Sequence, residues 1–343
     1  MGIASDDIDL SLPNIWLSWQ RFRVGKKTSY AILEFEQRLP ENILRLCADL
    51  NTGRYEHGKY THKIINEKKR RDIAVADVRD RIVHRLLYDY LVKIYDKKFD
   101  HDIWSCRIGK GNTAALARTQ KILRKYPNSY IWRCDIKKFF DNVNHEKLRE
   151  ILYRGEYREK ANNLLDKVIL SYTIMKPASQ PASQPASQPA SQPASRGVGI
   201  PIGNLSSQIF ANIYFNDFDF FVRHTIRPLA YVRYGDDFVL FCHTRDEAQS
   251  FQKNGTMFLK TLLNLSINPK NNVIIKAKQG LKYLGVTLYA DKMTLSGKDF
   301  NALVTKLDIK NAQTYSSYID KYGSKKQKLV MNFHIHMITE NTY

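Results

Sequence analysis

The chain has 343 residues, of which 43% are hydrophobic and 12% aromatic, and this composition excludes a largely disordered protein. Its 54 Lys and Arg residues outnumber its 34 Asp and Glu residues, which leaves a net charge of +20 at pH 7. This surplus favours a polyanionic partner, most commonly nucleic acid, over a basic surface that serves solubility or faces an anionic membrane.

The cysteines and the N-terminal segment indicate the compartment. Cys47, Cys106, Cys134 and Cys242 are far apart and form no C-x-x-C pair, so they favour neither a disulfide framework nor a zinc site. The acidic start "MGIASDDIDLSLPN" lacks the features of a secretory signal, and no window approaches about eighteen consecutive apolar residues. We therefore expect a cytoplasmic protein without a membrane span, built from two or three subdomains.

The first third of the chain predicts helices and one basic hairpin. Residues 14–50 place apolar side chains at helical spacing, with a break at Pro40. The segment "GKYTHKIINEKKRRDIAVADV" is basic and β-branched, so we expect a hairpin whose cationic run lies near the turn or on the second strand. In "RDRIVHRLLYDYLVKIYDKKF", apolar residues recur every four positions, which predicts a long amphipathic helix.

The middle of the chain contains helix, strand and linker signals. "GNTAALARTQKILRKY" has helical periodicity, and "YIWRCDIKKFF" begins as an apolar, strand-like run that ends at Asp135. Residues 177–195 repeat the tetrapeptide PASQ, whose small and polar residues cannot bury a core. We expect this repeat to be a disordered surface insertion without a chemical role. A helical pattern, "IFANIYFNDFDFFV", and an apolar run, "AYVRYGDDFVLFC", follow it.

A glycine-rich loop, "RGVGIPIGNLSSQ", precedes that helical pattern. It could cradle a phosphate at a helix N-terminus, bind a dinucleotide, or be an ordinary turn that needs glycine for its backbone angles. It lacks the Lys-Ser/Thr ending of a P-loop, and Gly197, Gly199 and Gly203 do not follow the G-x-G-x-x-G spacing. The loop alone leaves the choice open.

Two adjacent carboxylates interrupt the apolar run "AYVRYGDDFVLFC". We expect a hairpin with Asp236 and Asp237 at its crest, beside the strand that ends at Asp135. Neighbouring carboxylates repel and raise each other's pKa, and a bound cation usually offsets this repulsion. Their hard oxygen atoms suit Mg²⁺. Three carboxylates around two divalent ions would serve in-line phosphoryl transfer, whereas the plain alternative is an exposed Asp-Asp turn.

The order of these motifs resembles that of a reverse transcriptase palm. "RRDIAVADVRDRIVH", "RCDIKKFFDNV", "GIPIGNLSSQ", "YGDD" and "LKYLGVTLY" follow one another as in reverse transcriptases of the group II intron and retroelement type, over roughly residues 60–290. The loop reads much like that of reverse transcriptases from diversity-generating retroelements. The resemblance implies an α/β (α+β) right-hand polymerase with fingers, a palm on an antiparallel sheet, and a short helical thumb.

The resemblance also implies a division of the chain. The expected parts are a helical N-terminal extension, fingers, a palm that includes a fingers segment and the PASQ insertion, and a thumb. Their expected boundaries are, in that order, 1–62, 63–134, 135–290 with the insertion at 177–195, and 291–343.

Carried over position by position, the resemblance makes Asp135 and Asp236 the principal metal ligands and Asp237 the third carboxylate. The backbone carbonyl of Ile136 would be a further ligand. The implied cofactor is a pair of Mg²⁺ ions, with Mn²⁺ as an alternative, and the implied substrates are deoxynucleoside triphosphates.

Three residues outside the glycine-rich loop resemble nucleotide contacts of the family. Phe140 occupies the position of an aromatic steric gate, whose ring would clash with a ribose 2′-hydroxyl, while Phe139 beside it is expected in the core. Arg71 and Lys69 match basic residues of the fingers that clamp the triphosphate, a task that suits the bidentate hydrogen bonds of arginine. The plain alternative is that this basic run faces RNA phosphates.

Two further matches lie near the end of the palm. Lys270 in "INPKNN" resembles the lysine proposed in polymerases to protonate the leaving pyrophosphate, as a general acid. Tyr283, Leu284 and Gly285 fit the turn that grips the primer before the thumb.

The glycine-rich loop departs from the common reverse transcriptase pattern at two places. Most family members have glutamine before the loop's glycine and proline after its serine, whereas this chain has Ile202 before Gly203 and Gln208 after Ser207. We expect these residues to floor the nucleotide site, with glycine letting the backbone approach the nucleotide. An apolar Ile202 cannot form a hydrogen bond there. This should reduce the energy difference by which the site discriminates correct from incorrect nucleotides. The alternative is an isoleucine that only packs.

The resemblance implies RNA-directed DNA synthesis from a template-repeat RNA, error-prone at template adenines, for diversity-generating retrohoming. It also implies contact with the RNA/cDNA duplex and an oligomeric, basic accessory variability protein. One alternative is a group II intron-like or defence-associated reverse transcriptase of ordinary fidelity. Another is an inactive palm that serves as an RNA-binding scaffold, although the complete set of carboxylates argues against it.

Overall fold

The computed structural model describes residues 7–66, 70–154, 158–174 and 197–340. The PASQ repeat and Lys69 lie outside the described residues, so the expectations for them stay predictions. The chain folds into two compact units. Unit 1 comprises Met1–Asp100, Ile136–Phe221 and Thr256–Ile267, and unit 2 comprises His101–Asp135, Val222–Gly255 and Asn268–Tyr343. The boundaries expected for the extension, fingers, palm and thumb also stay predictions.

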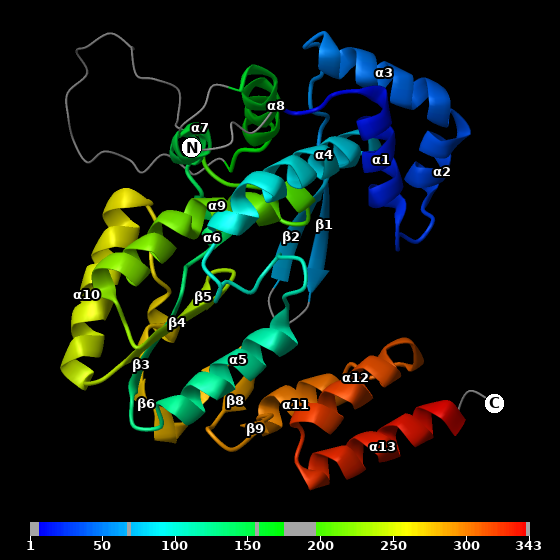
Figure 1. The fold of residues 1–343 in the computed structure, drawn as a ribbon. Coiled ribbons are helices and arrows are strands. Elements are labelled where there is room, and N and C mark those ends of the chain that lie inside the picture. The colour runs from blue at the N-terminus through cyan, green and yellow to red at the C-terminus, as the bar shows by residue number, and fades with distance from the viewer. Residues whose placement is uncertain (1–6, 67–69, 155–157, 175–196, 341–343) are drawn as a thin grey trace, which may run out of the picture. The chain divides into compact units, whose positions relative to one another are not determined.

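Unit 1 is mainly helical and carries one β-hairpin (Figure 1). Its elements are α1 (Leu12–Arg23), α2 (Tyr30–Gln37), α3 (Leu39–Asn51), β1 (Thr61–Asn66), β2 (Arg70–Val75), α4 (Val78–Tyr95), the 3₁₀ helix η1 (Asp96–Lys98), α6 (Phe139–Asn142), α7 (His145–Tyr153), α8 (Glu159–Leu170) and α9 (Leu205–Phe221). Helix α10 (Arg245–Leu262) contributes residues to both units.

The core of unit 1 forms around α4 and α9, which lie side by side in Figure 1. The predicted stripe of α4 is buried at Ile82, Leu86 and Ile94. Helix α9 is buried on nearly all sides, as expected for a helix that is apolar all round. The three N-terminal helices agree with the helical prediction for residues 14–50, and Pro40 lies in the first turn of α3, where proline is tolerated.

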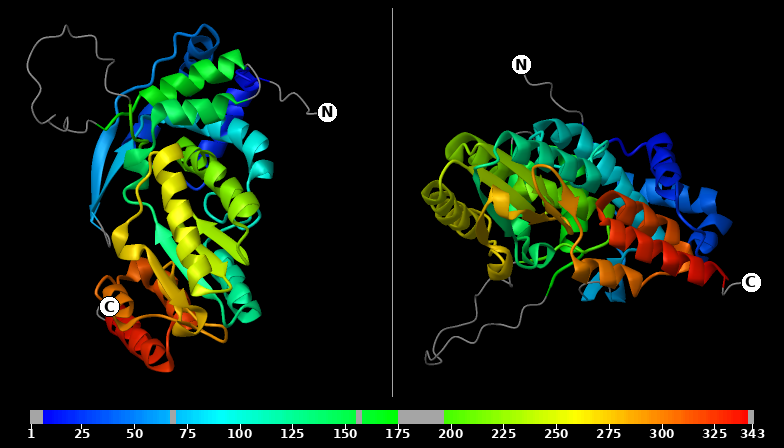
Figure 2. Two further views of the ribbon diagram at one scale, coloured as in Figure 1. Left: turned by 90° about the vertical axis from the view of Figure 1, so that its left-hand side faces the viewer. Right: turned by 90° about the horizontal axis from the view of Figure 1, so that it is seen from below.

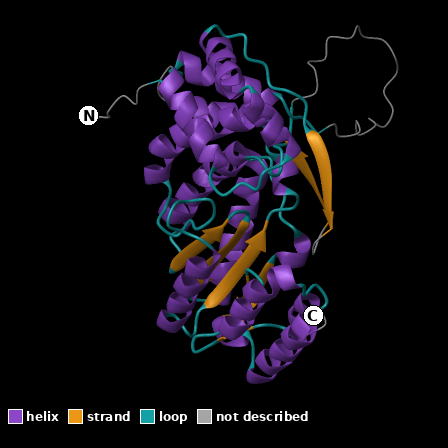
Figure 3. Cartoon of the chain, turned by 90° about the vertical axis from the view of Figure 1, so that its right-hand side faces the viewer, coloured by secondary structure: helices purple, strands orange, loops and turns teal. Residues whose placement is uncertain are grey.

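The predicted basic hairpin is present as β1 and β2, the two-stranded sheet in Figure 3. Its antiparallel register runs from Thr61 opposite Val75 to Asn66 opposite Arg70. The first three residues of β2 are exposed, and burial begins only toward its end. Arg70 and Arg71 are therefore exposed to solvent, while the end of β2 belongs to the core of unit 1.

Unit 2 holds a four-stranded sheet, a small three-stranded sheet and several helices. Its elements are α5 (Asn112–Lys125), β3 (Tyr130–Asp135), the π-helix η2 (Val222–Ile226), β4 (Ala230–Tyr234), β5 (Asp237–Cys242), η3 (Pro269–Asn271), β6 (Val273–Lys276), η4 (Ala277–Gln279), β7 (Leu281–Tyr283), β8 (Val286–Leu288), β9 (Met293–Thr294), α11 (Gly297–Val304), α12 (Ile309–Tyr322) and α13 (Lys325–Glu340).

The four-stranded sheet has the antiparallel order β4-β5-β3-β6. In β3, Trp132 is fully buried, and its ring meets Phe238 of β5 edge-on at 5.3 Å between centroids. Ile131 points to the opposite face, because side chains alternate along a strand. There it joins a core with Val239, Tyr283 and residues of α5 and the C-terminal helices. Burial on both faces explains why β3 and β5 read as nearly continuous apolar runs.

The C-terminal helices α11, α12 and α13 lie side by side, in orange and red in both views of Figure 2. Ile319, Tyr322 and Met331 are buried where they meet. Side-chain caps at Ser296 and Asp308 accept backbone hydrogen bonds at the starts of α11 and α12. Helices α11 to α13 agree with the helical thumb expected over residues 291–343, whereas Met293–Thr294 form the short strand β9. No helix in the described ranges combines the length and apolar character needed to cross a membrane.

Candidate active site

The turn between β4 and β5 carries the adjacent carboxylates. Tyr234 pairs with Asp237, so Gly235 and Asp236 form a two-residue hairpin turn. Gly235 has a φ of 65°, in the left-handed region that glycine adopts without a steric cost. The predicted hairpin with Asp236 and Asp237 at its crest is therefore present.

Ser105 and Arg233 hold this turn through the backbone of Gly235. The Gly235 N–H donates to Ser105 Oγ at 2.8 Å, and Arg233 Nη1 donates to the Gly235 carbonyl at 2.9 Å. Arg233 is only 1% exposed, and its backbone pairs with the segment around Ile103. The sequence did not indicate Ser105, which lies 130 positions from Gly235, nor Arg233, whose backbone pairs with the distant segment around Ile103.

Asp135 ends β3 and lies directly opposite Asp237 on β5. Its Oδ2 accepts hydrogen bonds from the side-chain amides of Asn271 at 2.7 Å and Asn268 at 3.3 Å. Its Oδ1 is buried and has no hydrogen-bond partner among the described residues. A buried carboxylate oxygen without a donor is costly unless a cation or a water meets it. Asp135 is thus held by one oxygen and offers the other, which fits a metal ligand.

Asp237 faces Arg133 of β3, with 3.4 Å between Asp237 Oδ2 and Arg133 Nη2. Burial raises the pKa of Asp237 to about 7; Arg133 opposes this shift, and Asp236 and Asp135 add to it. In the part of the chain that the structure describes, no group of three His, Cys, Asp or Glu side chains is arranged to hold a metal. Asp135 and Asp237 are paired across adjacent strands, and Asp236 lies in the turn just before Asp237. That the three carboxylates bind metal together stays a prediction.

The metal-free protein should lose stability as the pH rises, because of Asp237. Its carboxyl has an ordinary pKa of 3.8 and a folded-state pKa of about 7, so its stabilising contribution is complete below pH 3.8 and lost above pH 7. Without solvent screening, the pKa shift would correspond to about 4 kcal/mol of unfolding free energy. Because solvent reaches part of the carboxylate, we expect about 1–2 kcal/mol. The stability of Asp237→Asn relative to wild type should rise by that amount between pH 4 and pH 8.

Urea unfolding in EDTA at both pH values measures this difference. Using the change between two pH values cancels the constant effect of the substitution itself. A difference between variant and wild type that is the same at both pH values would show that Asp237 does not titrate in this range.

The glycine-rich loop is joined to β2 within unit 1. The Ala74 N–H donates to the Ile202 carbonyl at 3.1 Å, and Asn204 Nδ2 donates to the Ala74 carbonyl at 2.8 Å. Gly203 has a φ of 109°, and a Cβ at this position would lie 2.6 Å from Ile73 Cγ2. The close approach that requires glycine here is therefore made to β2, whereas an approach to a nucleotide stays a prediction.

The aromatic pair after β3 divides between core and surface. Phe139 is 4% exposed, while Phe140 is partly exposed. The Phe140 carbonyl accepts a hydrogen bond from the Ile200 N–H at 2.9 Å, so Phe140 lies beside the glycine-rich loop. Ile202 is partly exposed, and Gln208 is exposed on α9. These three predicted nucleotide contacts thus reach the surface of unit 1.

A family model described as reverse transcriptase (RNA-dependent DNA polymerase) matches residues 59–288, more than half of the chain. The chain belongs to the reverse transcriptase family. The matched range includes the three carboxylates, the glycine-rich loop and β2, and it ends before α11.

Among solved structures, this reverse transcriptase chain is similar to apo telomerase from Candida Tropicalis, truncated from its C-terminal domain. The TM-score is 0.49 and the identity 12%, and the match covers 75% of this chain and 60% of that chain. This chain therefore spans about 60% of the length of that telomerase. No curated protein sequence matches it.

The remaining predicted residues of this reverse transcriptase lie in both units. Lys270 is exposed in η3, between Asn268 and Asn271, whose side chains hold Asp135. Arg71 is exposed on β2 of unit 1. Ile136 follows β3 directly and is 2% exposed. We did not identify the two asparagines from the sequence, although "INPKNN" contains both.

The turn predicted to grip the primer joins β7 and β8. Tyr283 pairs with Val286, and Leu284 and Gly285 have φ values of 48° and 89°. Two positive φ values in a two-residue hairpin are typical of a type I′ turn. Tyr283 Oη donates to the backbone carbonyl of Asp237 at 3.3 Å, which connects this hairpin to the one that carries the carboxylates.

Proposed function

We propose that this chain is an RNA-directed DNA polymerase that extends a primer with deoxynucleoside triphosphates, using divalent metal ions, Mg²⁺ above all. The observation that supports it best is Asp135, whose buried Oδ1 lacks a partner among the described residues and which lies opposite Asp237 in a reverse transcriptase family chain. Asp135, Asp236 and Asp237 would hold the metal, with the carbonyl of Ile136 as a further ligand. The bound metal would lower the pKa of the primer hydroxyl and neutralise charge on the phosphates.

The protein's own residues would position the reactants. The amides of Asn268 and Asn271 hold one oxygen of Asp135, and so fix the direction of the other. Ser105 and Arg233 fix the turn that carries Asp236. Arg71 and Lys69 would bind the triphosphate, Phe140 would lie under the sugar, and the amine of Lys270 would donate a proton to the leaving pyrophosphate.

Primer extension on an RNA template with Mg²⁺ tests this function. Purified protein should add deoxynucleotides to a primer. If it forms no product even with its native RNA and an accessory protein, the proposed polymerase function is wrong. RNA binding that persists without extension would then favour the inactive scaffold.

We propose further that the polymerase belongs to a diversity-generating retroelement and works in the cytoplasm. It would copy a template-repeat RNA with errors at adenines, for mutagenic retrohoming, together with an oligomeric, basic variability protein. The support is the pair Ile202 and Gln208 in the glycine-rich loop. Ile202 is partly exposed, so its side chain is accessible to a nucleotide. This accessibility favours a role in nucleotide contact over a role in packing alone.

Ile202→Gln should lower misincorporation opposite template adenine by about five- to tenfold. A glutamine amide can hydrogen-bond where isoleucine cannot, and each tenfold in discrimination corresponds to about 1.4 kcal/mol. Sequencing of cDNA made from a defined RNA template measures the effect. Ile200→Val is the control, since Ile200 lies in the same loop but is 2% exposed. An unchanged error spectrum in Ile202→Gln would show that the Ile202 side chain does not affect fidelity.

A further inference from the structure

A buried row of hydrogen bonds connects the base of the β-hairpin to the first turn of α9. His57 Nε2 lies 3.1 Å from His84 Nε2, and His84 Nδ1 lies 2.6 Å from Ser206 Oγ. His84 and Ser206 are 1% and 0% exposed, and the side chain of His57 is equally inaccessible. Burying this many polar atoms carries a cost that apolar side chains of similar volume would avoid. The row therefore calls for a role that apolar packing does not provide.

His84 is the central member of the row. Burial, together with nearby His57 and Arg81, lowers the pKa of His84 to about 3, so His84 stays neutral. A neutral imidazole donates from one ring nitrogen and accepts at the other, and the Ser206 hydroxyl can do either, so His84 can pair with His57 and with Ser206 at the same time. At the outer end, His57 Nδ1 donates to the Gly58 carbonyl at 2.7 Å, and His57 Nε2 also lies 3.2 Å from the Tyr60 hydroxyl.

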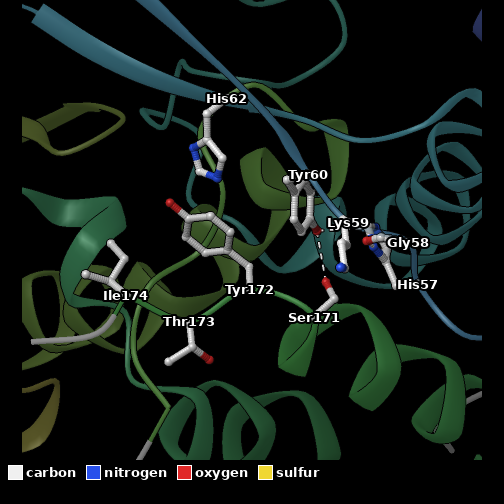
Figure 4. A pocket seen from close by; sticks show the side chains of 9 residues that line it. All are labelled: His57, Gly58, Lys59, Tyr60, His62, Ser171, Tyr172, Thr173 and Ile174. Atoms are coloured by element: carbon white, nitrogen blue, oxygen red, sulfur yellow. Dashed lines mark hydrogen bonds between the residues drawn. The ribbon is translucent and has the colours of Figure 1, made fainter. Parts of the chain in front are cut away.

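The outer end is held rigidly. Asp80 accepts from the Tyr55 hydroxyl at 2.8 Å and from the Gly58 N–H at 2.9 Å, and all three belong to unit 1. His57, Gly58 and Tyr60 line the pocket in Figure 4, where the Tyr60 hydroxyl lies 2.9 Å from Ser171 Oγ. The position of His57 is thus defined by the segment before β1 and by α4, independently of α9.

The inner end lies where the glycine-rich loop becomes a helix. Ser206 is the second residue of α9, three positions after Gly203. Asn204, between them, donates to the Ala74 carbonyl. The loop is therefore held on one side by β2 and on the other by His84. Apolar packing holds α9 against α4, and a directional hydrogen bond adds resistance to rotation of its first turn.

We propose that His84 is a positioning residue of this polymerase, which fixes the first turn of α9 and thereby the loop with Ile202 and Gly203. The inference rests on the proposed function, because it concerns how the nucleotide floor is held. His84 would act through Ser206 and would not itself touch the nucleotide. Removing the bond should loosen the loop, weaken nucleotide binding and leave the chemistry of bound nucleotide nearly unchanged.

Two neighbouring serines provide a matched test. Ser206 and Ser207 are 0% and 1% exposed and lie in the same turn of α9, but Ser207 Oγ has no hydrogen-bond partner among the described residues. Ser206→Ala and Ser207→Ala therefore remove the same atom, and only the first breaks the row. Amide hydrogen exchange of the full-length protein should be about three- to tenfold faster across residues 202–210 in Ser206→Ala, as expected for loss of one hydrogen bond. Ser207→Ala should exchange as wild type does.

His84→Asn provides the second arm. The asparagine side chain keeps a polar group near the former Nδ1, so it can still pair with Ser206 while losing His57. Its exchange rate should fall between those of wild type and Ser206→Ala. In steady-state extension, KM for the deoxynucleotide should rise about three- to tenfold in Ser206→Ala, and less in His84→Asn, while kcat changes less than about twofold.

Exchange and kinetics separate the two ways to fail. If Ser206→Ala and Ser207→Ala behave alike in exchange, or if Ser206→Ala lowers kcat with KM unchanged, His84 does not position the loop. If wild type shows no extension at all, the proposed function fails, while the exchange experiment still decides whether His84 orders the first turn of α9.

Discussion

Replacing Asp236 with asparagine should reduce primer extension by about a thousandfold or more, equivalent to about 4 kcal/mol of activation free energy. Asparagine has nearly the same shape, so the turn between β4 and β5 should persist. The substitution removes a negative charge from a site where carboxylates would hold divalent ions, and a neutral amide oxygen binds such ions much more weakly. Extension on an RNA template at saturating Mg²⁺ measures the loss.

Asp291→Asn is the matched control. Asp291 is exposed in unit 2, between β8 and β9, and its substitution removes the same charge from the same unit. It should keep wild-type activity, and circular dichroism should find both variants folded. If Asp236→Asn retains activity near that of Asp291→Asn, Asp236 does not hold the metal. If wild type itself lacks activity, the failure lies with the proposed function.

Replacing Phe140 with valine should lower the preference for deoxynucleotides over ribonucleotides by about a hundredfold. In the proposed site the phenyl ring occupies the space that a ribose 2′-hydroxyl would need, and valine vacates part of that space. Steric exclusion acts on the ribonucleotide alone, so kcat/KM for the deoxynucleotide should change little. The ratio of the two kcat/KM values measures the effect.

The neighbouring Phe139→Leu separates selectivity from stability. Phe139 is buried and meets Phe215 edge-on at 5.6 Å, so this variant should lose about 1 kcal/mol of stability and keep its sugar selectivity. Phe140 is partly exposed, so Phe140→Val should do the reverse. A selectivity that falls equally in both variants would indicate a general loosening of the region and no steric gate.

Local patterns predicted the elements that carry the candidate site. The apolar run interrupted by "YGDD" predicted the hairpin, and the apolar run before Asp135 predicted the strand beside it. The basic, β-branched segment predicted the pairing of β1 with β2. These patterns succeed because backbone preferences and burial act within a few residues along the chain.

The same patterns could not predict how the site residues are held. Ser105 supports the turn of Asp236, and Asn271 holds Asp135, yet neither residue has a neighbour in sequence that marks this role. His84 reads from the sequence as one more position of an amphipathic helix, and only the fold places it against Ser206, 122 residues away. The close approach of Gly203 to Ile73 was likewise not indicated by the sequence, while its expected approach to a nucleotide stays a prediction.

Composition and spacing indicate which chemistry is available to this protein: a large positive charge, three aspartates that end or interrupt apolar runs, and a glycine-rich loop that contains Ile202. The fold determines which oxygen of Asp135 is held and which lacks a partner among the described residues, that Asp237 pairs with Arg133, and that His84 reaches α9. Composition and periodicity follow from short-range preferences, whereas the state of a buried polar atom depends on the few partners that long-range folding brings within about 3 Å.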